Sequence, residues 1–151
     1  MKFFQLGQSL IEVLIATTVV AVVLTSLAAG LTMSLKTGAE SKYKSYASFY
    51  AEEANEFFRR ERVKLGWAEF RDTLDSLPNT VCILSLPNNL IEIAEFETSC
   101  SSGLVAVGAE FERVVTLNQP DAQTYLINVQ VSWINGEKQR QVSVDQIYKE
   151  Y

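Results

Sequence analysis

Residues 13–35 of this chain read VLIATTVVAVVLTSLAAGLTMSL, twenty-three positions in a row without a charged side chain. As an α-helix this stretch would be about 34 Å long, which is enough to cross the hydrocarbon layer of a bilayer. The whole chain has 151 residues, so its remainder is too small to bury such a helix on every side. We therefore expect a membrane-spanning helix rather than a buried core helix.

A cleaved secretory signal is the other explanation of this stretch. Ser26-Leu27-Ala28 has the small-x-small form that signal peptidase accepts. However, the apolar run is long for a signal peptide, and Lys2 is the only basic side chain that precedes it. A carboxylate, Glu12, also lies at the start of the run. These features favour a retained span.

The composition argues against an enzyme. The chain has 13 Lys and Arg, 18 Asp and Glu, a formal net charge of -5 and no histidine. The lack of histidine excludes the common catalytic dyads and triads and most zinc sites, and two cysteines cannot close a structural zinc site. The carboxylate pairs Glu52 with Glu53 and Glu110 with Glu112 have no acid-base or metal-binding group beside them in the sequence. We expect these four side chains on a solvated surface, no catalytic activity and no cofactor.

Glu12 is the one charged residue that falls inside the apolar segment. An ionised side chain there costs roughly 2.5 to 3.5 kcal/mol on insertion scales, so it predicts a function. A structural explanation is a capping box, because Ser9-Leu10-Ile11-Glu12 has the Ser-x-x-Glu spacing that satisfies free amides at a helix start. The functional explanation is that Glu12 meets a positive charge on another molecule, and the two explanations can hold together.

The residues around Glu12 resemble the class III signal of type IV pilins and the related pseudopilins. The resemblance rests on Gly7-Gln8-Ser9-Leu10-Ile11-Glu12 followed at once by the apolar run. In that family a prepilin peptidase cuts after the glycine and methylates the new amino terminus, and a glutamate five residues into the mature chain directs assembly. The resemblance thus implies cleavage between Gly7 and Gln8, N-methylation of Gln8 and an assembly role for Glu12. Gln8 and Ser9 stand where the family most often has Phe and Thr.

The resemblance also implies the pilin fold, an α+β fold in which a long N-terminal helix packs on a small antiparallel β-sheet. The first half of the helix would span the membrane. The expected segments are a leader (1–7), a transmembrane and assembly helix (8–35), an amphipathic continuation of the helix (36–64) and a globular β-sheet domain (65–151).

Periodic patterns in the residues after the span agree with this order of elements. One-sided apolar positions predict a helix stripe that packs in a core, at Tyr43, Tyr46, Ala47, Tyr50, Ala54, Phe57 and Phe58. A short helix or loop is expected before Pro78, and strands are expected at 81–86, 90–96, 111–117, 125–133 and 139–144. Alternation over 125–133 predicts one buried strand face, and Asn135-Gly136 predicts a type I′ hairpin turn.

The chain has two cysteines, Cys82 and Cys100. An even count in a domain outside the cytoplasm favours a disulfide. Closing a loop of about eighteen residues would contribute roughly 3 kcal/mol to stability. A reduced, buried pair is the alternative.

The charge distribution bears on partners and orientation. Residues 69–121 contain nine acidic side chains and only two basic ones, which argues against nucleic acid as a partner. A solvated helix face or an inter-subunit salt-bridge surface explains the cluster Arg59, Arg60, Arg62 and Lys64 better than DNA binding does. The lysines flanking the span slightly favour a cytoplasmic carboxy terminus, whereas the resemblance implies the opposite orientation, which we adopt.

The expected function is structural. The resemblance implies a prepilin that sits in the cytoplasmic (inner) membrane as a single-pass protein with its C-terminal domain outside, and that joins a type IV pilus at the cell surface as a minor pilin. Its implied partners are other major and minor pilin subunits, the prepilin peptidase, the inner-membrane assembly platform and, before assembly, membrane lipid. One alternative is a pseudopilin of a type II secretion or competence system. Another is an unprocessed single-span membrane protein with an exported binding domain.

Overall fold

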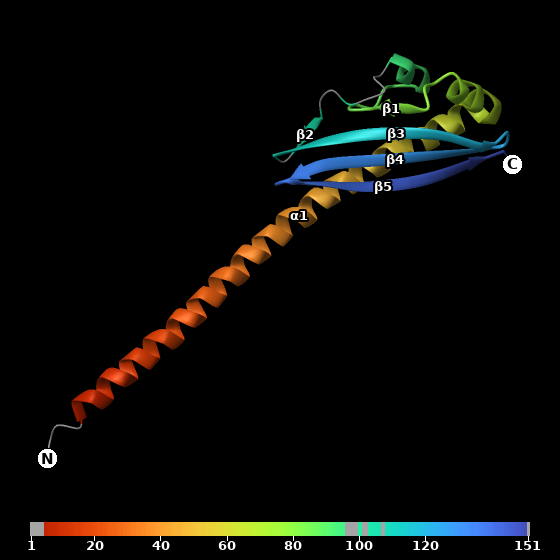
Figure 1. The fold of residues 1–151 in the computed structure, drawn as a ribbon. Helices are drawn as coiled ribbons and strands as arrows, with labels where there is room; N and C mark the ends of the chain where they lie inside the picture. Colours follow the sequence, from red (N-terminus) through yellow and green to blue (C-terminus); the bar gives the residue numbers. More distant parts are fainter. Residues whose placement is uncertain (1–4, 96–99, 101–102, 107, 151) are drawn as a thin grey trace. The chain divides into compact units, whose positions relative to one another are not determined.

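The computed structural model describes residues 5–95, 100, 103–106 and 108–150 (Figure 1). Helix α1 (Gln5–Asp75) comes first, followed by β1 (Thr80–Cys82), the 3₁₀ helix η1 (Leu90–Glu95), β2 (Leu104–Ala106), β3 (Ala109–Asp121), β4 (Thr124–Asn135) and β5 (Lys138–Lys149). The chain divides into two compact units, Met1–Glu40 and Ser41–Tyr151. The predicted α+β class, a long N-terminal helix and a small antiparallel sheet, is confirmed.

The sheet belongs to the second unit, Ser41–Tyr151. Its strands are antiparallel in the order β1-β3-β4-β5, with β2 paired to β3 beyond the end of β1 (Figure 1). Strand β4 buries every second residue from Tyr125 to Trp133, so the predicted alternation is confirmed. Strand β5 is the outermost described strand on its side and is exposed over most of its length.

Two predicted strands differ from the structure. The segment beginning at Leu90 is η1 rather than a strand, and residue 96 of the predicted range lies outside the described residues. Side chains satisfy the amides here: Asn89 Oδ1 accepts from the Glu92 amide at 3.2 Å, and the Glu92 carboxylate accepts from the Asn88 amide at 3.0 Å. These reciprocal bonds favour a helical turn over a β-ladder, in the manner of a capping box.

The predicted strand at 81–86 ends early, because β1 stops at Cys82. The carbonyls of Ile83 and Leu84 accept hydrogen bonds from the side chain of Arg113 instead of continuing a ladder. The predicted hairpin between β4 and β5 is present, but Asn135 pairs with Lys138, so the loop is Gly136-Glu137. Gly136 has φ +66°, and the first loop position of a two-residue hairpin requires a positive φ.

Helix α1 extends beyond the predicted boundary at residue 64. Gly66 interrupts it with a non-helical backbone (φ 78°, ψ 175°), after which the helix resumes to Asp75. Only glycine adopts this φ readily, so the break is local in origin. The helix resumes because Phe70 and Leu74 are buried in the core, and Phe70 contacts the ring of Tyr148 on β5.

The core of the second unit lies between α1 and one face of the sheet. Ala47, Ala51 and Ala54 are fully buried, and such small side chains let a helix approach a sheet closely. Phe57 and Phe58 follow on the same stripe and are also buried, which confirms the predicted helix face. Tyr46 departs from the prediction because it is 37% exposed.

Arg113 is a buried cation on the inner face of β3. Its guanidinium donates to the backbone carbonyls of Ile83 (2.8 Å), Leu84 (3.2 Å) and Tyr50 (3.0 Å), and pairs with the Glu53 carboxylate at 2.9 Å. Burial lowers the pKa of Arg113, and the hydrogen bond to Glu53 opposes this effect. A single side chain thus joins α1, β3 and the residues after β1.

Glu61 is a second buried charge and occupies a core position of α1. It is 1% exposed, and its carboxylate accepts from the amide of Leu90 (3.1 Å) and pairs with Lys64 (3.4 Å). The bond to Leu90 satisfies the first amide of η1. Buried charges need such partners, and this one fixes η1 against the helix.

Replacing Arg113 with Gln is expected to destabilise the protein by about 3 kcal/mol, because three carbonyls and a carboxylate lose their donor. The exposed Arg71, which pairs with Asp72, is the matched control, and Arg71→Gln should change stability by about 0.5 kcal/mol or less. Urea unfolding of the full chain in detergent, followed by tryptophan fluorescence, measures both. Equal losses in the two variants would contradict the role of Arg113.

Alkali is expected to weaken the fold through Tyr148. Burial raises the pKa of Tyr148 from 10.0 to about 12. Between these values the unfolded chain loses the phenol proton while the folded chain keeps it, so stability present below pH 10 declines as the pH rises toward 12. Urea midpoints measured from pH 9 to 12 should decline less steeply in Tyr148→Phe. Tyr46→Phe, at an exposed tyrosine, should follow the wild type, and a parallel decline in all three proteins would refute the assignment.

Candidate functional site

The apolar segment of the first unit leaves its side chains uncovered. The large apolar side chains between Leu10 and Leu35 are 51% to 75% exposed. Among the described residues, α1 is the one helix long and apolar enough to cross a membrane, and none of its apolar window is buried, although a signal sequence would pass the same test. An uncovered helix of this hydropathy calls for an apolar environment from outside the chain.

The hydroxyl groups in this segment are satisfied within the helix. Five of the six hydroxyl side chains in residues 13–35 donate to backbone carbonyls three or four residues earlier, at 2.8 to 3.0 Å. They are Thr17, Thr18, Thr25, Ser26 and Thr32. A hydroxyl bonded in this way presents little unmet polarity to lipid. The segment is therefore compatible with a bilayer despite its threonines.

Glu12 differs from these hydroxyls. Its side chain is exposed on α1, and no side chain or amide in the described part of the chain donates a hydrogen bond to it or forms an ion pair with it. A carboxylate left alone beside lipid is unfavourable, and the described residues supply no partner for it. Glu12 is thus the charged group of the apolar segment that has no counter-charge or hydrogen-bond donor among the described residues.

The capping-box explanation of Glu12 does not fit the full chain. Ser9 lies inside α1, which begins at Gln5, whereas an N-cap residue has a non-helical backbone. Gly7 and Gln8, the residues flanking the predicted cleavage point, also lie within the backbone of α1. Of the predicted leader, residues 1–4 lie outside the described residues.

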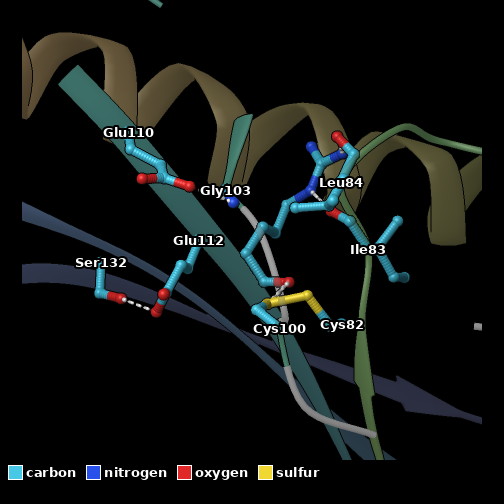
Figure 2. Close-up of a disulfide and its surroundings, with 9 residues drawn as sticks. Cys82, Ile83, Leu84, Cys100, Gly103, Glu110, Glu112 and Ser132 are labelled. Atoms are coloured by element: carbon cyan, nitrogen blue, oxygen red, sulfur yellow. Dashed lines mark hydrogen bonds between the residues drawn. A yellow bond between two sulfur atoms is a disulfide. The ribbon is translucent and has the colours of Figure 1, made fainter. Parts of the chain in front are cut away.

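Cys82 and Cys100 are joined in the structure. Their Cα atoms are 5.2 Å apart, within the range that a disulfide requires, and the two sulfurs are bonded (Figure 2). Cys82 ends β1 and is buried, and Cys100 lies with its sulfur 3.9 Å from the carbonyl of Arg113. The bridge holds Cys100 beside β3, next to the Arg113 contacts.

Three of the four carboxylates in the pairs that could suggest catalysis have structural partners. Glu110 accepts from the amide of Gly103 at 2.6 Å, and Glu112 accepts from the Ser132 hydroxyl at 3.4 Å (Figure 2). Glu53 pairs with Arg113, while Glu52 is exposed on the helix. Within the described ranges, no group of three or more Cys, Asp and Glu side chains could hold a metal ion.

The basic cluster on α1 is engaged in contacts within its own helix. Arg59 pairs with Glu56 and Lys64 pairs with Glu61. The guanidinium groups of Arg60 and Arg62 lie 5.4 Å and 5.1 Å from the ring centroids of Phe57 and Trp67. This arrangement is that of a helix surface covered by its own side chains.

The two buried charges, Arg113 and Glu61, were not predicted from the sequence, although each had a signal there. Arg113 falls two residues after Phe111 and two before Val115, so strand alternation places it on the inner face. Glu61 follows Ala54 and Phe58 at helical spacing, so the stripe includes it. A charged residue at a position that the strand or helix pattern assigns to the buried face therefore indicates a buried, paired charge.

No family model, curated protein or solved structure matches this chain.

The disulfide is expected to be complete in protein isolated from an oxidising compartment. Alkylation of the denatured chain followed by mass spectrometry should find no free thiol, and two labelled cysteines would contradict the bond. Because the bridge closes a separation of 18 residues, the Cys82→Ser, Cys100→Ser double variant should lose about 3 kcal/mol of stability in urea.

Proposed function

We propose that this chain is a structural subunit of a filament of the type IV pilus or pseudopilus kind, and that it acts as a minor pilin without catalytic activity. The observation that supports the proposal most directly is Glu12, a carboxylate at the start of the apolar segment with no partner in the described chain. The Gly7 to Glu12 motif and the helix-on-sheet fold support it further.

In the proposed chemistry, cleavage produces a positively charged amine, which then pairs with Glu12. Cleavage between Gly7 and Gln8 by a prepilin peptidase frees the amine of Gln8. This amine is the missing partner of Glu12. In a single inserted chain the two groups lie four residues apart on one helix and can shield each other. In a filament the amine of one subunit meets the Glu12 of a neighbour, where the pair is screened little by water and is costly to separate.

Assembly then follows from the rest of the span. The apolar side chains of residues 13–35 are uncovered in the single chain, so packing them against neighbouring spans replaces lipid contacts by helix contacts. The hydroxyls donate to carbonyls of their own helix, so they add few unsatisfied donors to the packed spans. The Glu12 pair sets the register of the packed helices, and the C-terminal unit lies outside the cytoplasm.

Glu12→Val is expected to abolish incorporation into filaments, measured by immunoblotting of sheared filaments from a cell that assembles them and lacks the native copy. Glu52→Val removes an exposed carboxylate of the second unit and should be incorporated as the wild type is. Mass analysis of the amino terminus should show that both variants and the wild type begin at Gln8.

Two outcomes would overturn the proposal. Incorporation of Glu12→Val at the wild-type level would remove the assembly role of this carboxylate. Retention of residues 1–7 in membranes that contain an active prepilin peptidase would leave an anchored domain with no filament function.

A further inference from the structure

An aromatic surface stands uncovered on the first turns of α1 in the second unit. Lys42, Ser45, Tyr46 and Phe49 follow the i, i+3, i+4, i+7 spacing that places residues on one helix face. Phe49 is 58% exposed and Tyr46 is 37% exposed. The opposite face, with Ala47 and Ala51, is buried in the core, so this face is the solvent side of the helix.

The two exposed rings pack on the partly buried ring of Tyr50. Phe49 packs on Tyr50 with ring centroids 5.8 Å apart, and Tyr46 lies 6.4 Å from the same ring. Tyr50 in turn contacts Phe111 of β3 at 5.6 Å. The rings therefore form an ordered apolar platform, which costs less side-chain entropy to bury than a mobile one.

The sign of charge changes along this face. Lys42 belongs to it and is exposed, whereas the next turns carry the exposed carboxylates Glu52 and Glu56; Lys44 is also exposed but lies on another side of the helix. An anionic surface would attract the first two turns of the unit and repel the following ones. The rings thus stand at the cationic end, where such a surface would approach.

The few residues between the apolar stretch and Lys42 keep this face close to the bilayer. Lys42 follows the last residue of the apolar stretch, Leu35, by seven residues, a distance of about 10 Å as a helix and at most about 25 Å extended. Aromatic side chains with an apolar body gather at membrane interfaces, and lysines beside them favour anionic headgroups. We propose that the face formed by Lys42, Ser45, Tyr46 and Phe49 docks onto the anionic headgroup layer of the membrane in the inserted, unassembled protein.

The exposed area favours lipid over a second protein. Two aromatic side chains bury at most roughly 300 to 500 Å² together, and these two are already partly covered. A stable protein interface takes about 800 Å² from each partner. A bilayer needs no such area, because the span already holds the unit beside it. The contact requires that residues 42–49 lie close to the membrane plane, and it depends on insertion of the span but not on cleavage after Gly7 or on Glu12.

The test uses the full chain reconstituted in vesicles of phosphatidylcholine with phosphatidylglycerol. Ser45→Cys introduces a single reactive thiol between the two rings, because Cys82 and Cys100 are bonded. Glu52→Cys lies seven residues further on the same face and is the matched control. Each is labelled with the polarity-sensitive dye NBD, and spin-labelled lipids with the nitroxide near the headgroup serve as the quencher.

The label at residue 45 is expected to shift to the blue and to be quenched, while the label at residue 52 keeps the emission it has in water. Adding Tyr46→Ser and Phe49→Ser to the Ser45→Cys protein should remove the quenching, and Lys42→Gln or 0.5 M salt should weaken it. Equal quenching at the two positions, or none at residue 45, would overturn the proposal. So would a blue shift at residue 45 that depends on protein concentration and comes without lipid quenching, because it would assign the face to a second copy.

Discussion

The guanidinium of Arg113 connects α1, β3 and the residues after β1 in the second unit by directed hydrogen bonds within their shared core. It donates hydrogen bonds to carbonyls of α1 and of the residues after β1, while β3, its own strand, pairs with β4. A hydrophobic contact would tolerate sliding between helix and sheet, whereas four directed bonds from one planar group do not. Glu61 acts in the same way at η1, so the position of the irregular segment depends on two buried charges.

The first unit obeys a different constraint, which is polarity in an apolar surrounding. Its helix satisfies its own backbone, and five of the six hydroxyls in residues 13–35 donate to that backbone, so this stretch presents mainly apolar side chains to its surroundings. Glu12 is the exception, a charged and exposed side chain at the start of this apolar stretch. The described chain supplies no partner for this carboxylate, which is why Glu12 carries the functional proposal.

The regular parts of the fold could be predicted from the sequence, because they follow from periodicity. The span is one uninterrupted apolar run, while the helix stripe at Ala47 to Phe58 and the alternation in β4 each repeat one period over many residues. The segment at Leu90 has strand-like composition, yet its conformation is decided by side chains that cap its amides, one of them from Glu61 twenty-nine residues earlier. The pattern of residues along the chain contains no information on this hydrogen bond between Glu61 and Leu90. The motif at Gly7 to Glu12 came from resemblance, and the structure adds that no described residue is a partner of Glu12.

Among the described strands, β5 forms a long outer edge of the sheet, and such edges can pair with other chains and lead to aggregation. Here the edge begins and ends with lysine, with Arg140 near one end, and strand-to-strand contact between copies would bring these like charges together. Molecules crowded side by side are therefore kept from fusing into amyloid-like ribbons.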